Sequence, residues 1–337
     1  MAETRGVKTE PQQLGLFGAA GVGAATVSRK PADPKFLQRL ESEHAEAAAI
    51  AKRLPSGVFF GTSTWSFPGW AGIVYSRRAT AAELAREGLA EYARHPLLTT
   101  VGIDRGYYGP IPAEDLRRYA SQLPPLFPCC AKAPEAVTSA ASPDYLDPQR
   151  FVDEMVGPFL DAFRDHTGPF LLQLPPAPRG VTPEPSRFAE RLDRFLRDLP
   201  TGARYAVELR DPSLLTPAYR DVLRARGAAH VYNYATAMPM PEEQALRVPL
   251  ETASFVVIRL LLRPGTRYEE RREEFVPFDR IVDPSPEMRR EVVSLLRQAV
   301  GLGRDVFVLV NNKAEGCSPL TIRALAEALA EEREGHG

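Results

Sequence analysis

Two patterns of apolar and polar positions alternate along this chain. Short runs dense in Val, Leu and Phe are each followed by a segment whose apolar residues recur every three or four positions. Runs of this kind are typical of parallel strands buried on both faces, with a helix after each strand. The eight predicted strands lie in GVFFGTSTW, LLTTVGID, FPCCAKAP, PFLLQLP, RYAVELR, AHVYNYA, SFVVIRLLL and DVFVLVNN.

The intervening segments predict helices that cover such a sheet. They are expected at residues 80–94, 112–122, 148–165, 185–198, 216–227, 286–300 and 318–331, and an amphipathic helix at 34–53 leads into the first strand. The connection after the sixth strand holds three prolines and a short helix, and residues 263–284, crowded with Arg and Glu, are expected to form a loop. Eight strand–helix units favour an α/β fold, the closed (β/α)8 TIM barrel, with an open doubly wound sheet as the alternative.

Residues 1–33 have a different character from the rest of the chain. They are rich in Gly, Ala, Pro and Thr and follow neither period, so we expect a disordered N-terminal arm at 1–33, a leading helix within 34–56 and the barrel domain at 57–332. The arm's GAAGVGAAT resembles a dinucleotide-binding loop only superficially. A Rossmann site needs a strand before the glycines and a helix after them, and neither is predicted.

Charge and cysteine content narrow the classes of protein. The net charge of −1 provides no general attraction to polyanions, so a nucleic-acid contact would need a local basic patch. Cys129, Cys130 and Cys317 lack CxxC spacing, which favours reduced thiols. The longest apolar runs are far shorter than a bilayer span. These features predict a cytoplasmic protein without a membrane partner.

Candidate chemistry gathers where the predicted strands end. In a TIM barrel the functional side chains stand at the carboxyl ends of the strands. The catalytic candidates there are Lys132, Glu208 and Asp104, and the ligand-binding candidates are Trp65, Tyr108, Gln173, Arg210, Arg259, Asn233 and Asn311.

The fifth strand shows how charges could enter the barrel. Alternation in YAVELRD puts Val207 and Leu209 on one face and Glu208 and Arg210 on the other, toward the barrel interior. A structural salt bridge between the two charges is one interpretation, because buried charges must be paired. The convergence of further polar groups on the same mouth favours a ligand site instead.

The cations at the mouth suit an anionic ligand. Lys132, Arg210 and Arg259 could hold a phosphate or carboxylate. Glu208 and Asp104 would then be general acid or base, and Lys132 either an electrostatic clamp or a Schiff-base amine. The aromatic residues in WSFPGW and YYGP either stack on a sugar or base or pack over the barrel rim.

Metal and triad chemistry find little support in the sequence. None of the five histidines is predicted at the mouth, so we expect no multi-histidine metal centre, while Mg²⁺ held by carboxylates stays open. A Ser-His-Asp triad lacks both a placed histidine and a GxSxG turn. No cofactor is predicted.

Five segments resemble, in order and spacing, the signatures of the YecE-like family, a domain of unknown function numbered seventy-two. They are GTSTWSFPGWAGIVY, AKAPEAVT, LLQLPP, YAVELRDPS and VLVNNKAEGCSPLTIRAL, within residues 57–330. The resemblance implies a TIM barrel with no established reaction, distantly similar to endonuclease IV and xylose-isomerase-like barrels, and with a suggested DNA-related role. It places mouth residues at Trp65, Tyr108, Lys132, Gln173, Glu208, Arg210, Arg259 and Asn311.

The chain departs from that family at two places. Where Glu-x-Asn is usual in the second strand, it has Gly102 and Asp104, and where RHPSW is usual it has RDPSLL with Asp211. These changes indicate a divergent branch with an altered ligand preference. The scarcity of histidine also argues against the trinuclear zinc chemistry of endonuclease IV.

The arm contains an apolar peptide with no core to join. Gln13, Leu14, Leu16 and Phe17 form QLGLF, which is similar to the QLxLF peptide that docks bacterial replication and repair proteins on the sliding clamp. The alternative is an arm that folds back over an apolar patch of the barrel.

Three functions therefore stay open. The first is a barrel that binds a phosphate-bearing ligand, including nucleic acid, and is brought to DNA by the arm. The second is a small-molecule enzyme acting on a sugar phosphate or organic acid. The third is a non-catalytic binding module.

Overall fold

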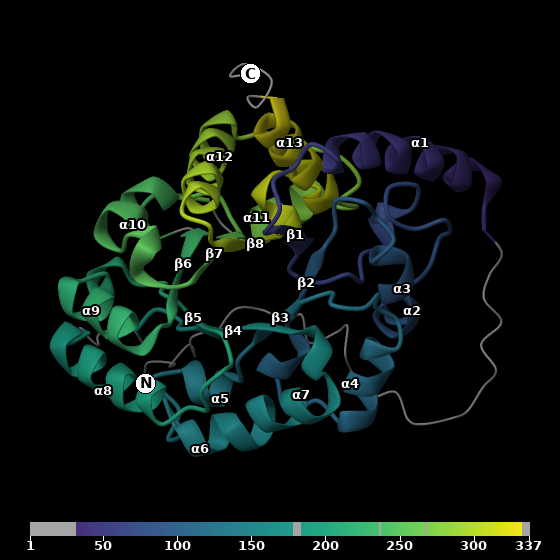
Figure 1. The fold of residues 1–337 in the computed structure, drawn as a ribbon. Helices are drawn as coiled ribbons and strands as arrows, with labels where there is room; N and C mark the ends of the chain where they lie inside the picture. Colours follow the sequence, from purple (N-terminus) through teal and green to yellow (C-terminus); the bar gives the residue numbers. More distant parts are fainter. Residues whose placement is uncertain (1–31, 178–182, 236, 267, 332–337) are drawn as a thin grey trace, which may run out of the picture.

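Eight parallel strands close into a barrel in chain order, with β8 pairing β1 (Figure 1). The computed structural model describes residues 32–177, 183–235, 237–266 and 268–331. The closed barrel is confirmed over the open sheet. The strands are β1 (Val58–Thr62), β2 (Thr100–Ile103), β3 (Cys129–Lys132), β4 (Thr167–Gln173), β5 (Tyr205–Glu208), β6 (Ala229–Tyr234), β7 (Phe255–Leu260) and β8 (Asp305–Val310).

Helices surround the barrel on its outside (Figure 1). The predicted helix at 80–94 is a pair of helices, and the one at 148–165 is α6 and α7 joined by a π-helical turn at Val152–Val156. The helices are α1 (Pro34–Ala51), α2 (Ala81–Glu87), α3 (Leu89–Tyr92), α4 (Ala113–Ala120), α5 (Glu135–Thr138), α6 (Pro148–Phe151), α7 (Gly157–Ala162), α8 (Pro185–Arg197), α9 (Pro217–Arg226), α10 (Pro241–Arg247), α11 (Tyr268–Phe275), α12 (Pro286–Gly301) and α13 (Ser318–Glu331).

The loop predicted at 263–284 contains a helix, α11, so that prediction was wrong in part. Its sequence, YEERREEF, is built mostly of Glu and Arg, which are good helix formers. A helix that is polar on nearly every side has no apolar residues recurring every three or four positions, and that recurrence is what indicates a helix in a sequence.

The buried residues divide into two sets, inside and outside the barrel wall. The inner set is Phe59, Cys130, Leu171, Ala206, Ala229, Val231, Ala253, Phe255, Val257, Phe307 and Leu309. Arg204 closes the amino-terminal end: its guanidinium lies 5.7 Å from the Phe255 ring centre and 5.5 Å from that of Phe307, and it pairs with Asp305 at 3.0 Å. The amino-terminal end is thus plugged by aromatic rings, which leaves the other end for a site.

β1 and β2 approach each other more closely than side chains permit. A Cβ built on Gly61 would lie 2.1 Å from the Thr100 carbonyl oxygen, and one built on Gly102 would lie 2.5 Å from that of Ser63. Real Cβ contacts are never this short. The two strands therefore pack glycine against backbone, and a side chain at position 102 requires the backbone to move.

The leading helix α1 is fastened at both its ends. Asp33 caps it by accepting a hydrogen bond from Lys35 N at 2.9 Å, and Arg323 of α13 binds Glu43 and Glu46. The predicted arm at 1–33 lies almost wholly outside the described residues, as does its 13–17 peptide. In the described part of the chain no helix is long and apolar enough to cross a membrane.

Candidate ligand site at the barrel mouth

A ring of polar residues lies on the inner face of the barrel at the carboxyl ends of its strands. Because side chains on one face of a strand are two residues apart, each inner apolar residue is followed on the same face by a polar one at the carboxyl end. The ring consists of Ser63, Asp104, Lys132, Gln173, Glu208, Asn233, Arg259 and Asn311, one from each strand or the residue after it. Most of the predicted site residues thus share one mouth.

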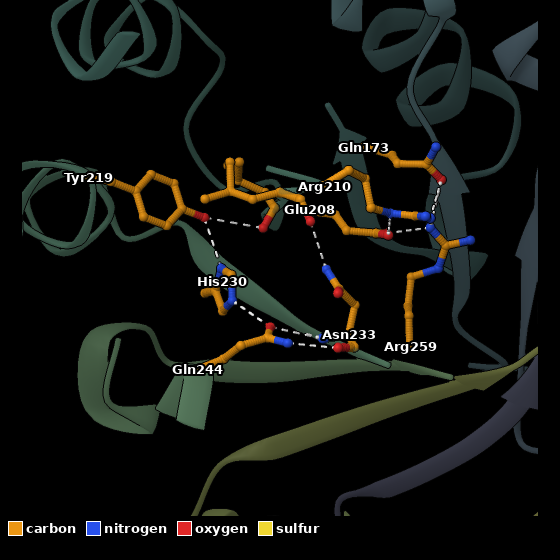
Figure 2. Close-up of polar contacts among 10 residues, drawn as sticks. Gln173, Glu208, Arg210, Tyr219, His230, Asn233, Gln244 and Arg259 are labelled. Carbon is orange, nitrogen blue, oxygen red and sulfur yellow. Dashed lines mark hydrogen bonds and ion pairs between the residues drawn. The ribbon is translucent and has the colours of Figure 1, made fainter. Parts of the chain in front are cut away.

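Glu208 joins the polar side chains of three strands. It is fully buried; Arg210 Nε donates to its Oε1 at 2.5 Å, and Arg259 Nη1 donates to its Oε2. Both guanidiniums also donate to Gln173 Oε1 at 3.2 Å (Figure 2). The predicted pair of Glu208 and Arg210 exists, and Arg259 extends it across the mouth.

The two arginines decide the protonation state of Glu208. Burial by itself would raise the pKa of this carboxyl, but the attraction of Arg210 and Arg259 and their hydrogen bonds lower its pKa to about 2. Glu208 is therefore ionised at any physiological pH, and both its oxygens are occupied. This state suits a group that holds two guanidiniums in place.

Lys132 is the third cation of the mouth, and its charge is poorly compensated. Its Nζ lies 3.5 Å from the ring centre of Tyr107. Burial lowers the pKa of Lys132 to about 8, with repulsion from Arg259 and Arg210 acting in the same direction and attraction by Asp104 and Glu208 opposing it. Lys132 pairs with Leu171 of β4, two residues before Gln173, so its side chain lies on the inner face next to the residue that binds both arginines.

Three buried polar atoms of the ring have no hydrogen-bond partner among the described residues. They are Ser63 Oγ, Asn233 Oδ1 and Arg259 Nε, on side chains that are 3%, 0% and 2% exposed. Asn233 and Arg259 are paired in register between β6 and β7. Buried polar groups in proteins are nearly always satisfied, so these three atoms call for a water molecule or a ligand.

Asn233 is held from the outer side of the wall by a chain of hydrogen bonds (Figure 2). Its Nδ2 donates to the Leu209 carbonyl at 2.8 Å, which leaves Oδ1 as a free acceptor on the inner side. Gln244 Nε2 donates to the Asn233 carbonyl at 2.7 Å, and Gln244 Oε1 accepts from Asn233 N at 3.1 Å. The side chain of Gln244, on α10, is therefore hydrogen-bonded to both the backbone N–H and the backbone carbonyl of Asn233.

His230 completes this support as a neutral ring. Gln244 Nε2 donates to two carbonyls, so its Oε1 is an acceptor, and His230 Nε2, 3.1 Å away, must carry the proton. His230 Nδ1 then accepts from Tyr219 Oη at 2.9 Å. Burial lowers the pKa of His230 to about 4, with the Gln244 hydrogen bond opposing it. His230 therefore acts structurally, by linking Tyr219 of α9 to Gln244 of α10 on the outside of the barrel.

The structure does not bring every predicted residue into the mouth. Trp65 is buried and donates its indole N–H to the Leu84 carbonyl at 2.9 Å. Tyr108 is 46% exposed, and it is Tyr107 that contacts Lys132. Asn311 does belong to the ring, and its side-chain oxygen accepts from Lys313 N at 3.0 Å, a contact that orders the turn after β8.

The comparisons with known proteins bear on this fold and on its family. The family model described as "Protein of unknown function DUF72" matches residues 59–336. The chain belongs to the DUF72 family. No curated protein matches its sequence.

Two solved DUF72 structures share the fold. A DUF72 family protein from Thermotoga maritima MSB8 is 18% identical with a TM-score of 0.59, over 82% of this chain and 99% of that one. A DUF72 family protein from Enterococcus faecalis V583 is 15% identical with a TM-score of 0.56, over 81% and 95%.

The two departures of this DUF72 chain have structural consequences. Gly102 packs against the backbone of Ser63. The β2–β3 pairs end at Ile103 and Ala131, and continuing this register sets Asp104 level with Lys132, so the carboxyl of this segment lies one inner-face step nearer the rim than position 102. Asp211 accepts from Ser213 N at 2.9 Å and Ser213 Oγ at 2.6 Å. It caps the turn after β5.

Replacing Glu208 by Gln is expected to destabilise the DUF72 barrel by about 3–5 kcal/mol, because it leaves the buried guanidinium of Arg259 and the partly buried one of Arg210 without a counter-charge. Chemical denaturation at pH 7 measures the loss. The control is Glu243→Gln, which breaks an exposed pair with Arg247 and should cost under about 1 kcal/mol. Equal stability of the two variants would show that Glu208 does not hold the mouth together.

Replacing Lys132 by Met is expected to stabilise the protein by about 1–3 kcal/mol at pH 7, because the pKa of Lys132 lies below its ordinary value and burying its charge is unfavourable. Between pH 8 and 10.5 the unfolded wild-type chain binds more protons at Lys132 than the folded protein does. The free energy of unfolding of the wild type therefore rises over this window, and its deficit relative to Lys132→Met shrinks. Denaturation from pH 7 to 10.5 tests this, with exposed Lys52→Met as the control. An advantage that is independent of pH contradicts it.

Proposed function

We propose that the barrel mouth binds the phosphate or carboxylate group of a ligand between Arg259 and Lys132. The observation that carries the proposal is the buried Arg259 Nε, a charged donor without an acceptor, beside an amine that repels it. An oxyanion supplies the missing acceptor and the missing negative charge together.

The charge of the cluster supports an anionic ligand. Glu208 compensates only one of the two guanidiniums that bind it, and Lys132 adds a further positive charge that Asp104 opposes. This excess of positive over negative charge adds little to the stability of the fold, since even paired buried charges contribute weakly to stability. Cations gathered in a barrel mouth instead focus a field that attracts anions.

The unpartnered atoms indicate what else the ligand carries. Arg259 Nε can only donate, Asn233 Oδ1 can only accept, and Ser63 Oγ can do both. With Arg259 Nε–H bound by the oxyanion, Asn233 Oδ1 on the paired residue still needs a donor, which a hydroxyl on the ligand supplies. The site therefore favours hydroxylated anions such as sugar phosphates and hydroxy acids.

The mouth residues then divide their roles. Glu208 orients Arg210 and Arg259, because its low pKa and its occupied oxygens leave it unable to transfer protons near neutral pH. Asp104, at the rim opposite Lys132, is the carboxyl that stays suited to acid–base chemistry. These assignments replace the acid–base role first expected for Glu208.

Binding of an anion is expected to raise the pKa of Lys132, so that up to about half a proton is taken up per ligand at pH 8. Isothermal titration calorimetry in buffers of different ionisation enthalpy measures the uptake. Glycerate and sulfate are suitable probes because neither titrates near pH 8, and a panel of sugar phosphates follows.

Lys132→Met should abolish the uptake and weaken binding about 10- to 100-fold. Lys52→Met should change neither quantity. The proposal fails if no anion in the panel binds, or if binding proceeds without linked protonation and is unaffected by Lys132→Met.

We further propose that the protein docks on the bacterial sliding clamp through Gln13, Leu14, Leu16 and Phe17. The sequence QLGLF favours this, since Leu and Phe can enter an apolar pocket while Gln satisfies polar groups at its edge. Docking would bring a phosphate-binding barrel to DNA and connect it with DNA metabolism or repair.

Full-length protein is expected to bind purified sliding clamp in a fluorescence polarisation assay, and the double change Leu16→Ala with Phe17→Ala should weaken binding at least about tenfold. Val27→Ala, an apolar change in the arm outside the peptide, is the matched control. Absence of binding at high micromolar clamp removes the link to DNA.

A further inference from the structure

Lys132 has the surroundings of a reactive amine. It ends β3 on the inner face of the barrel, and its Nζ rests over the face of Tyr107. Among the described residues no carboxylate lies within ion-pair distance of this Nζ, because the one buried carboxylate of the mouth, Glu208, is taken by two guanidiniums. The amine therefore contacts the Tyr107 ring and takes no part in the ion pairs that Glu208 makes with the two arginines.

The amine also stands next to the anion site and to a carboxyl group. Lys132 pairs with Leu171 of β4, and Gln173, the next residue on the same inner face of β4, accepts hydrogen bonds from both Arg210 and Arg259. A ligand whose anionic end is held by Arg259 presents its neighbouring carbon atoms to Lys132. This is the arrangement that proximity catalysis requires.

We propose that Lys132 forms an imine with an aldehyde or ketone group on the anionic ligand. This inference rests on the proposed anion site and names the substrate class as a carbonyl compound bearing a phosphate or carboxylate. It gives the barrel covalent chemistry that binding alone does not imply.

The step balances without any further reactant. The neutral Nζ forms a bond to the carbonyl carbon, and the carbonyl oxygen leaves as water with the two hydrogens of the amine. In this proposal Asp104, which directly follows the neighbouring strand β2, takes a proton from the nitrogen and donates one to the departing oxygen. The product is a Lys132 imine, which solvent protonates to an iminium ion.

The protonation state of Lys132 agrees with this chemistry. With a pKa of about 8, roughly one amine in ten is neutral at pH 7, against fewer than about one in a thousand for an ordinary lysine. Only the neutral amine is nucleophilic, so burial among cations raises the reactive fraction more than a hundredfold.

Three sources of the same carbonyl chemistry can be told apart by experiment. A short oxo acid carries the carbonyl beside a carboxylate, a triose phosphate carries it beside a phosphate, and an abasic site in DNA carries an aldehyde between two phosphates. The matched probes are glyoxylate, glyceraldehyde 3-phosphate and an oligonucleotide with one abasic site.

The full-length protein is incubated with each probe and cyanoborohydride, which reduces an imine to a stable secondary amine, and the modified lysine is mapped by mass spectrometry. We expect Lys132 to be labelled at least about tenfold faster than Lys52 in at least one arm. Lys132→Arg keeps the positive charge and should abolish labelling at this position while preserving anion binding. Lys52→Arg should leave the labelling of Lys132 unchanged.

The outcomes separate this inference from the anion site. Selective labelling of Lys132 that sulfate suppresses supports both, and the arm in which it occurs identifies the source of the carbonyl. Labelling no faster than at Lys52 in all three arms overturns the imine, even when calorimetry shows that anions bind. Loss of both labelling and anion binding overturns the proposed function as well. Mapping on the wild-type protein keeps the test valid even if a Lys132 variant does not fold.

Discussion

The carboxylate of Glu208 is the constraint on which the barrel mouth depends. Two guanidiniums could not lie inside a barrel without a counter-charge, and Glu208 provides it to both from a fully buried position. Its oxygens bind Nε of Arg210 and Nη1 of Arg259, and Gln173 Oε1 accepts from Nη2 of Arg210 and from the same Nη1 of Arg259. Because the network uses Nη1 of Arg259 and leaves Nε free, the ion pair that stabilises the mouth also creates its open donor.

Hydrogen bonds on the outside of the barrel fix the position of a second mouth residue, Asn233. Asn233 could turn its amide in either direction, but the bond from Nδ2 to Leu209 leaves the oxygen facing inward. Gln244 fixes the backbone of this residue, and neutral His230 fixes Gln244. A histidine that the sequence analysis rejected as a ligand thus orders a site residue through the strand, which supports a precise geometry at the mouth.

The sequence predicted strands and inner-face residues well, because both follow from a period of two. Glu208, Arg259 and Lys132 could be placed on the inner face for this reason. The helix α11 was missed because its residues lack an apolar face. The choice of Tyr107 over Tyr108, and the burial of Trp65 against α2, depend on how each loop turns after its strand. Alternation ceases there, so the sequence could place these residues at the rim and could not say which way they point.

The residues at positions 102 and 104, where this chain departs from the usual family sequence, affect the pKa of Lys132. The resemblance to other family members places a glutamate where this chain has Gly102, on the strand beside Lys132. Here the glycine lets β1 and β2 close together, and the acid of this strand moves to Asp104 at the rim. Gly102 pairs with Cys130, one inner-face step below Lys132, and a carboxylate there would favour the charged form of the amine. Removing that charge from the interior while keeping the arginine clamp changes the amine from a fixed cation into a group that titrates near neutral pH. In this chain, therefore, no residue within β2 places a carboxylate on the inner face, and Glu208 pairs with the two arginines and not with Lys132.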